Sequence, residues 1–483
     1  MPFPFRAKSS RAWRLITVFV VITAHSIYAE DKINYLEHVL PLIETHCAKC
    51  HNGDKKKGDL DLTSYNGAMK GGGSGVAVVA ANPEGSKLFR AVTHAEEPTM
   101  PPNKGRLPDK ELDVFKRWIA GGLLENSGSK AAAARPAVDL AVKVTTLGKP
   151  DGPPTMPGNL PQEPVLRPQR GSAVVGLASS PWAPVLAVGA PKQILLFHAE
   201  TLKLLGALPF PEGQPVDLKF SRNGKLLIAG GGHGGKSGKV ALWDLANGQR
   251  LATIGNEYDA ILASDISPDQ AEVALGGPGR LVKIFSTKTG ELLHKLKRHT
   301  DWVTAIAFSP NGETLATADR NGGIVMWDAD SGQEMFSLAG HKASVTALQW
   351  RGDGKFLASA SEDGAIKLWE PSEGKQFKTW NAHAGGALCV SFTHDGRMVS
   401  CGRDNQLMLW DANGNKLRAL EFPGELPVRT VFSHDGSRVV AGDWNGKVRV
   451  WNTDDKKSIG ELSLGPAAKS VVVAEQRTDS RVH

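Results

Sequence analysis

From about residue 171 to residue 465, the chain repeats one pattern of short alternating hydrophobic segments separated by glycine-containing turns. One repeat shows the whole pattern: Val345 to Trp350, Gly352-Asp353-Gly354, Leu357 to Ser361, Asp363-Gly364 and Ile366 to Trp369. Alternation of this kind predicts half-buried strands, and the turns predict hairpins between them. An aromatic residue that ends one strand recurs at Phe197, Trp243, Phe285, Trp327, Trp369, Trp410 and Trp451.

These aromatic residues are spaced 46, 42, 42, 42, 41 and 41 positions apart. Repeats of about 40–45 residues with this ending resemble WD repeats, which form the four-stranded blades of propellers. The pattern therefore predicts an all-β, seven-bladed propeller over residues 171–465, followed by a C-terminal tail over 466–483. The first three repeats depart from the pattern, because Phe197 and Phe285 replace tryptophan and the second repeat has an insertion from Gly230 to Gly238.

The WD resemblance implies a buried, hydrogen-bonded set of a histidine, a turn aspartate and the tryptophan within a blade. Two repeats supply such residues: His341, Asp363 and Trp369, and His383, Asp404 and Trp410. Because buried polar groups persist when they are hydrogen-bonded, we expect these histidines to be structural and not metal ligands or bases. The propeller sequence shows no nucleophile elbow, metal-binding cluster or paired carboxylates, and such propellers are mostly interaction platforms.

Helical periodicity replaces alternation in the first part of the chain. Apolar residues at Ile33, Leu36, Val39, Leu40 and Ile43 predict a helix, in which Pro41 either occupies a first-turn position or makes a kink. A second helix begins near Pro108 and Asp109 and ends at Gly121-Gly122, with an apolar face of Leu112, Phe115, Trp118 and Ile119. Two terminal helices packed together predict a small all-α domain over residues 30–127.

Residues 128–170 join the two predicted domains. An alanine run and eight prolines between Pro136 and Pro168 cannot bury a core, so we expect an extended, semi-rigid linker. Within it, Leu140 to Leu147 alternates enough to predict a strand that covers an edge of the propeller.

The first 29 residues are typical of a secretory signal peptide. Four basic residues precede an apolar run from Leu15 to Ala24, and we expect cleavage after Ala29. The run is short for a transmembrane span, so we expect an extracytoplasmic protein, periplasmic or otherwise secreted, with no membrane span in the mature chain. Removing this segment lowers the formal net charge from +7 to +3, and the basic pI is therefore no sign of nucleic-acid binding.

The sequence Cys47-Ala48-Lys49-Cys50-His51 carries the candidate chemistry. In an exported protein, C-x-x-C-H is the attachment signal for a c-type haem. Two thiols at this spacing reach both vinyl groups of one porphyrin, and the histidine that follows them becomes the proximal iron ligand. A redox dithiol would need a βαβ context, and a zinc site would need a second ligand pair; the sequence shows neither.

The second iron ligand is expected between the two helices. Met100, followed by Pro101 and Pro102, is the best candidate, because a thioether is a soft ligand that raises the reduction potential. His94 is the rival ligand. The remaining cysteines, Cys389 and Cys401, lie on neighbouring predicted strands as either a disulfide or two buried thiols.

Several segments in this order resemble the planctomycete-type cytochrome c domain: His46 to Gly53, Lys57 to Leu62, Ser86 to Val92, Met100 to Pro102 and the closing helix with Trp118. The resemblance covers nearly all of residues 31–125. It implies one haem c bound covalently to Cys47 and Cys50, with His51 and Met100 as axial iron ligands.

Three functions fit this organisation. The first is an exported electron carrier whose propeller docks a redox partner protein, which a six-coordinate His51/Met100 iron favours over catalysis. The second is a haem-dependent oxidoreductase whose propeller funnel binds a substrate or second cofactor; haem nitrite reductases have a similar order of domains, but their propellers have eight blades. The third is a scaffold that senses redox state. The sequence sets neither the direction of electron flow nor the oligomeric state.

Overall fold

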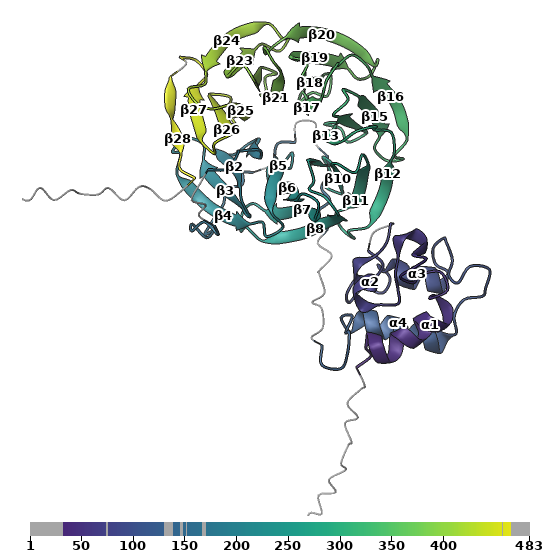
Figure 1. Ribbon diagram of the computed structural model, residues 1–483. Helices are drawn as coiled ribbons and strands as arrows, with labels where there is room; N and C mark the ends of the chain where they lie inside the picture. The colour runs from purple at the N-terminus through teal and green to yellow at the C-terminus, as the bar shows by residue number, and fades with distance from the viewer. Residues whose placement is uncertain are drawn as a thin grey trace, which may run out of the picture.

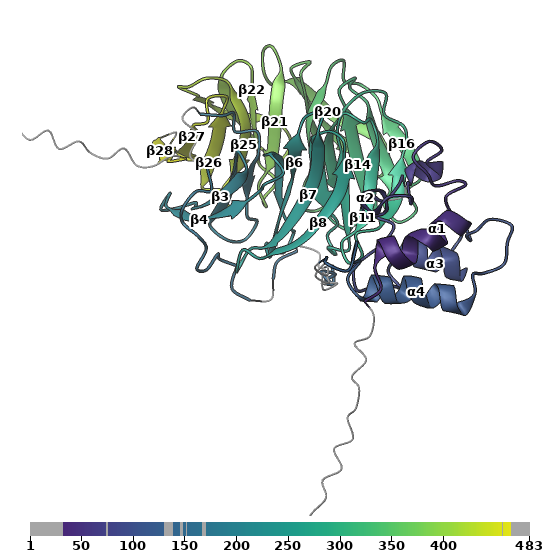
Figure 2. The same ribbon diagram turned by 60° about the horizontal axis from the view of Figure 1, so that its bottom comes forward.

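The computed structural model describes residues 32–73, 76–129, 139–144, 148–150, 152–166, 171–455 and 457–464. The predicted signal peptide and the predicted C-terminal tail lie outside these residues. Figures 1 and 2 show a small helical domain at the rim of a large propeller, away from the central channel. The described residues contain no helix that is long and apolar enough to cross a membrane.

The regular elements of the N-terminal region are short helices, and the described part of residues 32–129 contains no β-strand. The elements are the π-helix η1 (Tyr35–Val39), α1 (Leu40–His46), the 3-10 helix η2 (Lys57–Asp59), α2 (Tyr65–Lys70), α3 (Lys87–Thr93) and α4 (Asp109–Ala120). The Leu40 N–H bonds to Tyr35 O, one residue further back than in an α-helix. Pro41 then occupies the first turn of α1, where its missing N–H costs nothing. The predicted helix is therefore present, with a π-turn ahead of the proline.

The predicted helix α4 has the expected bounds and buries the four predicted apolar residues. Its Trp118 ring lies 5.6 Å from the ring of Tyr35 in η1, and Trp118 Nε1 donates to Leu124 O at 3.0 Å. The backbone of the first helix also meets the chain after α4, because Tyr35 N–H donates to Leu124 O at 2.8 Å. The two terminal helices thus pack together and enclose the core of the domain.

Seven four-stranded antiparallel sheets form the propeller, each built from consecutive strands (Figure 1). Their bounds are β1 (Leu177–Ser179), β2 (Val185–Ala190), β3 (Gln193–His198), β4 (Leu204–Pro209), β5 (Gln214–Phe220), β6 (Leu226–His233), β7 (Ser237–Asp244), β8 (Arg250–Glu257), β9 (Ala263–Ile266), β10 (Glu272–Gly276), β11 (Val282–Ser286), β12 (Leu292–Leu296), β13 (Val303–Phe308), β14 (Thr314–Asp319), β15 (Ile324–Asp328), β16 (Glu334–Leu338), β17 (Val345–Trp350), β18 (Leu357–Ser361), β19 (Ala365–Glu370), β20 (Lys375–Asn381), β21 (Ala387–Phe392), β22 (Met398–Gly402), β23 (Gln406–Trp410), β24 (Lys416–Glu421), β25 (Pro427–Phe432), β26 (Arg438–Asp443), β27 (Val448–Asn452) and β28 (Ser458–Leu462). The prediction of seven blades is confirmed, and the recurring aromatic residue lies on the third strand of every blade.

Three blades contain the same buried set of four hydrogen-bonded side chains. In blade five, His341 Nδ1 lies 2.9 Å from Asp363, and Ser359 Oγ lies 2.7 Å from His341 Nε2 and 2.8 Å from Trp369 Nε1. The same arrangement joins His383, Asp404, Ser400 and Trp410 in blade six, and His299, Asp319, Thr317 and Trp327 in blade four. The predicted sets are confirmed. The bridging hydroxyl and the set in blade four were not predicted.

Blade seven meets blade one through side-chain and backbone contacts. Every blade consists of four consecutive strands, so no strand from one end of the propeller completes the blade at the other end. Val174 N–H donates to Asp443 O at 3.0 Å, just ahead of the first strand of blade one. The Arg438 guanidinium on β26 donates to the carbonyl oxygens of Ala199 and Glu200, each at 2.7 Å. Val440, Val448 and Val450 of blade seven also pack in one core with blade one, so polar and apolar contacts together join the two blades.

The described parts of the linker lie on the propeller surface. Leu140 is buried against blades two and three, and Leu160 against blades one and two. Val142 N–H donates to Asp269 O at 2.7 Å, and Gly158 N–H donates to Ala246 O at 2.8 Å. No strand forms in the described residues 139–144, so the prediction of an edge strand there is wrong. These hydrogen bonds anchor the linker to the propeller.

Candidate functional site

The five residues Cys47 to His51 form a compact turn at the C-terminal end of α1. Cys47 N–H continues the helix by donating to Ile43 O at 2.8 Å, and the N–H groups of Cys50 and His51 both donate to Cys47 O, at 3.1 and 3.0 Å. The turn therefore holds the two thiols and the imidazole within one stretch of fixed backbone. That is the spacing that attachment to one porphyrin requires.

Both thiols of this turn are free and partly buried. Burial raises the pKa of the Cys47 thiol to about 11, so the thiol is neutral. Cys47 and Met100 both pack against the hydrophobic core of the helical domain, which includes Phe115 and Trp118. The sequence-predicted attachment site and distal ligand thus border the same apolar core.

Three histidines of this domain have a buried ring nitrogen without a hydrogen-bond partner among the described residues: His46 Nε2, His51 Nδ1 and His94 Nε2. An unpaired buried polar atom is costly and calls for an explanation. An imidazole beside free thiols, with a thioether on the same core, is the donor set of a c-type haem. The residues around Cys47, Cys50 and His51 therefore fit a c-type haem.

Met100 and His94 are held by the same turn of α3. Ala91 O accepts the N–H groups of both residues, at 3.0 Å for Met100 and 3.3 Å for His94. His94 adopts a left-handed backbone conformation, with φ of 61°, where it ends the helix. Both candidates for the distal ligand are therefore anchored to one point, and the choice of Met100 stays a prediction.

A long-range contact that the sequence did not reveal supports the attachment turn. His46 Nε2 lies 3.0 Å from Glu111 Oε2 on α4, in an electrostatic approach that lacks the alignment of a hydrogen bond. This pair links the residue before Cys47 to the closing helix. No local pattern predicts such a pair, because its members lie far apart in the sequence.

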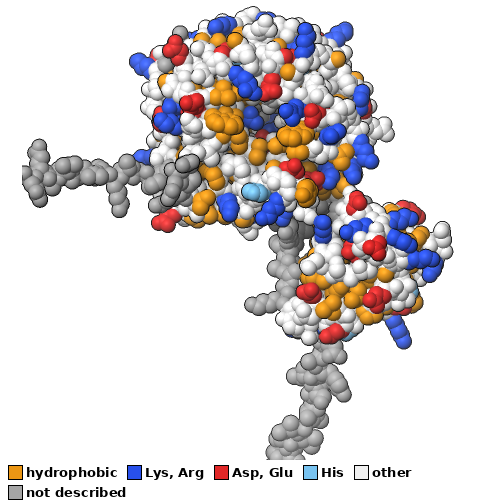
Figure 3. Space-filling model, in the orientation of Figure 1, with side chains coloured by type: hydrophobic (Ala, Val, Ile, Leu, Met, Phe, Trp, Pro, Cys, Tyr) orange, Lys and Arg blue, Asp and Glu red, His pale blue; other side chains and the backbone are white. Residues whose placement is uncertain are grey.

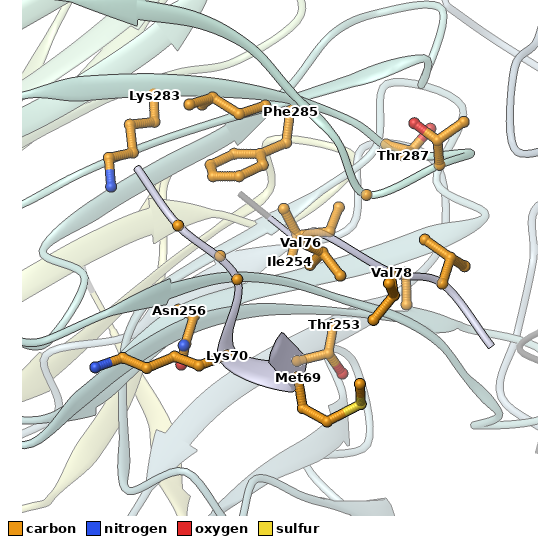
Figure 4. Close-up of a pocket in the computed structure, with 18 of the residues that line it drawn as sticks. Met69, Lys70, Val76, Val78, Thr253, Ile254, Asn256, Lys283, Phe285 and Thr287 are labelled. Carbon is orange, nitrogen blue, oxygen red and sulfur yellow. The ribbon is translucent and has the colours of Figure 1, made fainter. Parts of the chain in front are cut away.

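The helical domain and the propeller enclose a cleft of about 720 Å³. Figure 4 shows Val76 and Val78 of the helical domain beside Ile254 of blade two and Phe285 of blade three. Next to this cleft, Arg90 on α3 forms an ion pair with Glu291, in the turn between β11 and β12. The two domains thus meet through specific contacts and not through one continuous packed interface.

The propeller offers no metal site among the described residues, where no group of three potential ligands occurs. Its buried histidines His299, His341 and His383 are hydrogen-bonded to aspartate and hydroxyl partners, as expected. Cys389 on β21 and Cys401 on β22 lie directly opposite each other, and both are buried free thiols. The sequence left open either a disulfide or two buried thiols, and the structure has two buried thiols.

Together, these features define a helical domain with a haem-attachment motif that is fused to a seven-bladed propeller. Comparison with known families agrees with both halves. Residues 47–104 match the family described as Planctomycete cytochrome C, and residues 265–478 match the family described as IFT122 first beta-propeller. The chain is a cytochrome–propeller fusion that joins these two kinds of domain. No curated protein matches the chain.

Proposed function

We propose that this protein is an exported c-type cytochrome that transfers electrons through one covalently bound haem, and that its propeller docks the redox partner. The observation that supports this most directly is the Cys47–His51 turn. It combines free thiols with an unpartnered buried imidazole nitrogen, and it lies within residues that match a cytochrome c family. The small helical domain serves as the all-α cytochrome fold that encloses the haem.

Each residue of the site has a defined role in this proposal. Cys47 and Cys50 bind the porphyrin through thioethers, His51 is the proximal ligand, and Met100 is the distal ligand. When bound, the haem supplies a one-electron redox centre. The protein orients the group through the hydrogen-bonded turn and excludes water through the core around Phe115 and Trp118. Two protein ligands leave no iron position open to a substrate, which favours electron transfer.

The partner-docking surface is proposed on the propeller face that carries the loops between the second and third strands of each blade. Trp444 lies in such a loop, and Trp302 lies in a loop between blades that opens on the same face. Their exposed fractions are 59% and 42%, and the Arg320 guanidinium lies 5.1 Å from the Trp302 ring. Exposed tryptophan and arginine side chains are the residues that dominate protein interfaces. Figure 3 shows hydrophobic side chains beside the central hollow of the propeller, with charges of both signs interspersed.

An absorption spectrum tests the proposal. The full-length protein is exported from a host with haem-attachment machinery, and spectra are taken before and after dithionite and after carbon monoxide. Sharp low-spin reduced bands that carbon monoxide leaves unchanged would support a closed His/Met iron and an electron carrier. A shift with carbon monoxide would show an open distal position and favour the oxidoreductase. Absence of covalent haem would refute both functions.

A further inference from the structure

Arg90 joins the helical domain to the propeller through one guanidinium group. Its Nε lies 2.5 Å from Glu96 Oε2, its Nη1 donates to Glu84 O at 2.8 Å, and its Nη2 pairs with Glu291 of blade three. The side chains of Arg90 and Glu291 are only 20% and 17% exposed. Limited exposure makes this charge-assisted contact stronger than an ordinary surface ion pair.

Blade three orients the Glu291 carboxylate independently of Arg90. Thr289 Oγ1 donates to Glu291 Oε2 at 3.2 Å and accepts the Glu291 N–H at 3.3 Å. One carboxylate oxygen is thereby held by the turn between β11 and β12, and the other faces Arg90. The acceptor for Arg90 is therefore preorganised by the propeller.

The same turn of α3 holds the segment from residue 94 to residue 100. Arg90 O accepts the Ala95 N–H at 2.9 Å, and Ala91 O accepts the Met100 N–H at 3.0 Å. The Arg90 side chain also holds Glu96 within this segment. Arg90 thus binds the distal-ligand segment on one side and blade three on the other.

We propose that Glu291 is a positioning residue for the distal haem ligand. Acting through Arg90, it fixes the segment 94–100 and keeps Met100 in place over the iron. The inference rests on the proposed function, because it takes Met100 as the ligand. The adjacent cleft leaves part of the domain interface unpacked, and the ion pair is a direct contact between α3 and blade three beside it.

The test compares the full-length wild type with Glu291→Gln and with a matched control, Asp139→Asn. Asp139 pairs with Lys288 of the same blade at 2.8 Å, but it lies in the linker and does not contact α3. Amide hydrogen exchange of the peptide that contains Met100 is measured with and without haem. The rate of carbon monoxide binding to the reduced protein is measured in parallel.

We expect Glu291→Gln to raise both the exchange rate and the carbon monoxide rate about tenfold, the effect of losing one hydrogen bond to a charged group. Asp139→Asn should change neither rate. Arg90→Lys, which keeps the charge but loses the planar fork, should behave like Glu291→Gln.

Unchanged rates in a haem-loaded Glu291→Gln protein would overturn the inference while leaving the electron-carrier proposal intact. Equal acceleration in Asp139→Asn would show general loosening of the domain interface, and would also overturn it. A wild type that carries no haem would refute the proposed function, whereas the exchange measurement without haem would still report whether Glu291 fixes the segment.

Discussion

Replacing Ser359 with alanine removes the hydroxyl at the centre of the buried set in blade five. Ser359 Oγ is bonded both to His341 Nε2 and to the Trp369 Nε1–H group, and the residue has no exposed surface. Ser359→Ala therefore leaves one buried acceptor and one buried donor without a partner. Each such group costs about 1–3 kcal/mol, so we expect the free energy of unfolding to fall by about 2–6 kcal/mol.

Chemical unfolding of the full-length protein, followed by tryptophan fluorescence, measures this loss. Ser359→Thr keeps the hydroxyl and should recover most of the stability, because Thr317 makes the same two contacts in blade four. Ser337→Ala is a surface control on an exposed position of β16, with an expected change within about 0.5 kcal/mol. A Ser359→Ala protein that is as stable as Ser337→Ala would refute the idea that the hydroxyl satisfies both buried groups.

Three further predictions concern the haem, the pH dependence and the closure of the ring. Met100→Ala should let the reduced iron bind carbon monoxide and should lower the reduction potential in a redox titration. His94→Gln should have neither effect. The reverse result would make His94 the ligand. Burial lowers the pKa of His341 and of His383 below the ordinary value of about 6.5, so the unfolded chain binds protons first on acidification. Stability in unfolding titrations should therefore decline as the pH falls below about 6.5, and the decline should weaken in His383→Gln; a flat profile would contradict neutral buried imidazoles. Arg438→Gln should destabilise the propeller by about 1.5–3 kcal/mol in the same assay, because its charged hydrogen bonds join blade seven to blade one. No loss of stability would show that the other contacts between these blades, including their shared apolar core, suffice to close the ring.

Local periodicity explains which elements could be predicted from the sequence. The bounds of α4 follow from a proline just before its first turn, a glycine stop and an apolar stripe, all within one short segment. The seven blades follow from one repeated aromatic position, since each repeat is a complete meander of four strands. Helices and strands that neighbouring residues specify can be predicted from the sequence, because tertiary contacts reinforce the secondary structure that the local sequence favours.

The bridging hydroxyls were missed although a signal was present. In blades four, five and six, a threonine or serine precedes the strand-ending tryptophan by ten positions: Thr317, Ser359 and Ser400. The hydroxyl and the tryptophan lie on neighbouring antiparallel strands, so a fixed hairpin length sets this spacing. Blade seven has Ala441 at the same distance from Trp451, and the spacing therefore identifies which blades carry the complete set.

Contacts between distant segments could not be predicted, although they support the candidate site. Arg90 and Glu291 are separated by 201 residues, and His46 meets Glu111 across two helices. The first pair depends on how the two domains dock, and the second on how two helices of one domain pack together. The turn from Cys47 to His51 was found because its chemistry lies in adjacent residues, whereas the support for Met100 comes from backbone bonds to Ala91 that no motif encodes.

The position of the linker bears on how an electron carrier of this design would work. A free spacer would let the haem domain move through a large volume, and a partner docked on the propeller would meet it rarely. Here Val142 is bonded to blade three, Asp139 pairs with Lys288, and Arg90 pairs with Glu291. The first two contacts anchor the linker to blade three, and the third joins the helical domain itself to the same blade. Under the proposed function, a partner bound to the propeller would therefore meet the helical domain at a place that the contact between α3 and blade three helps to set.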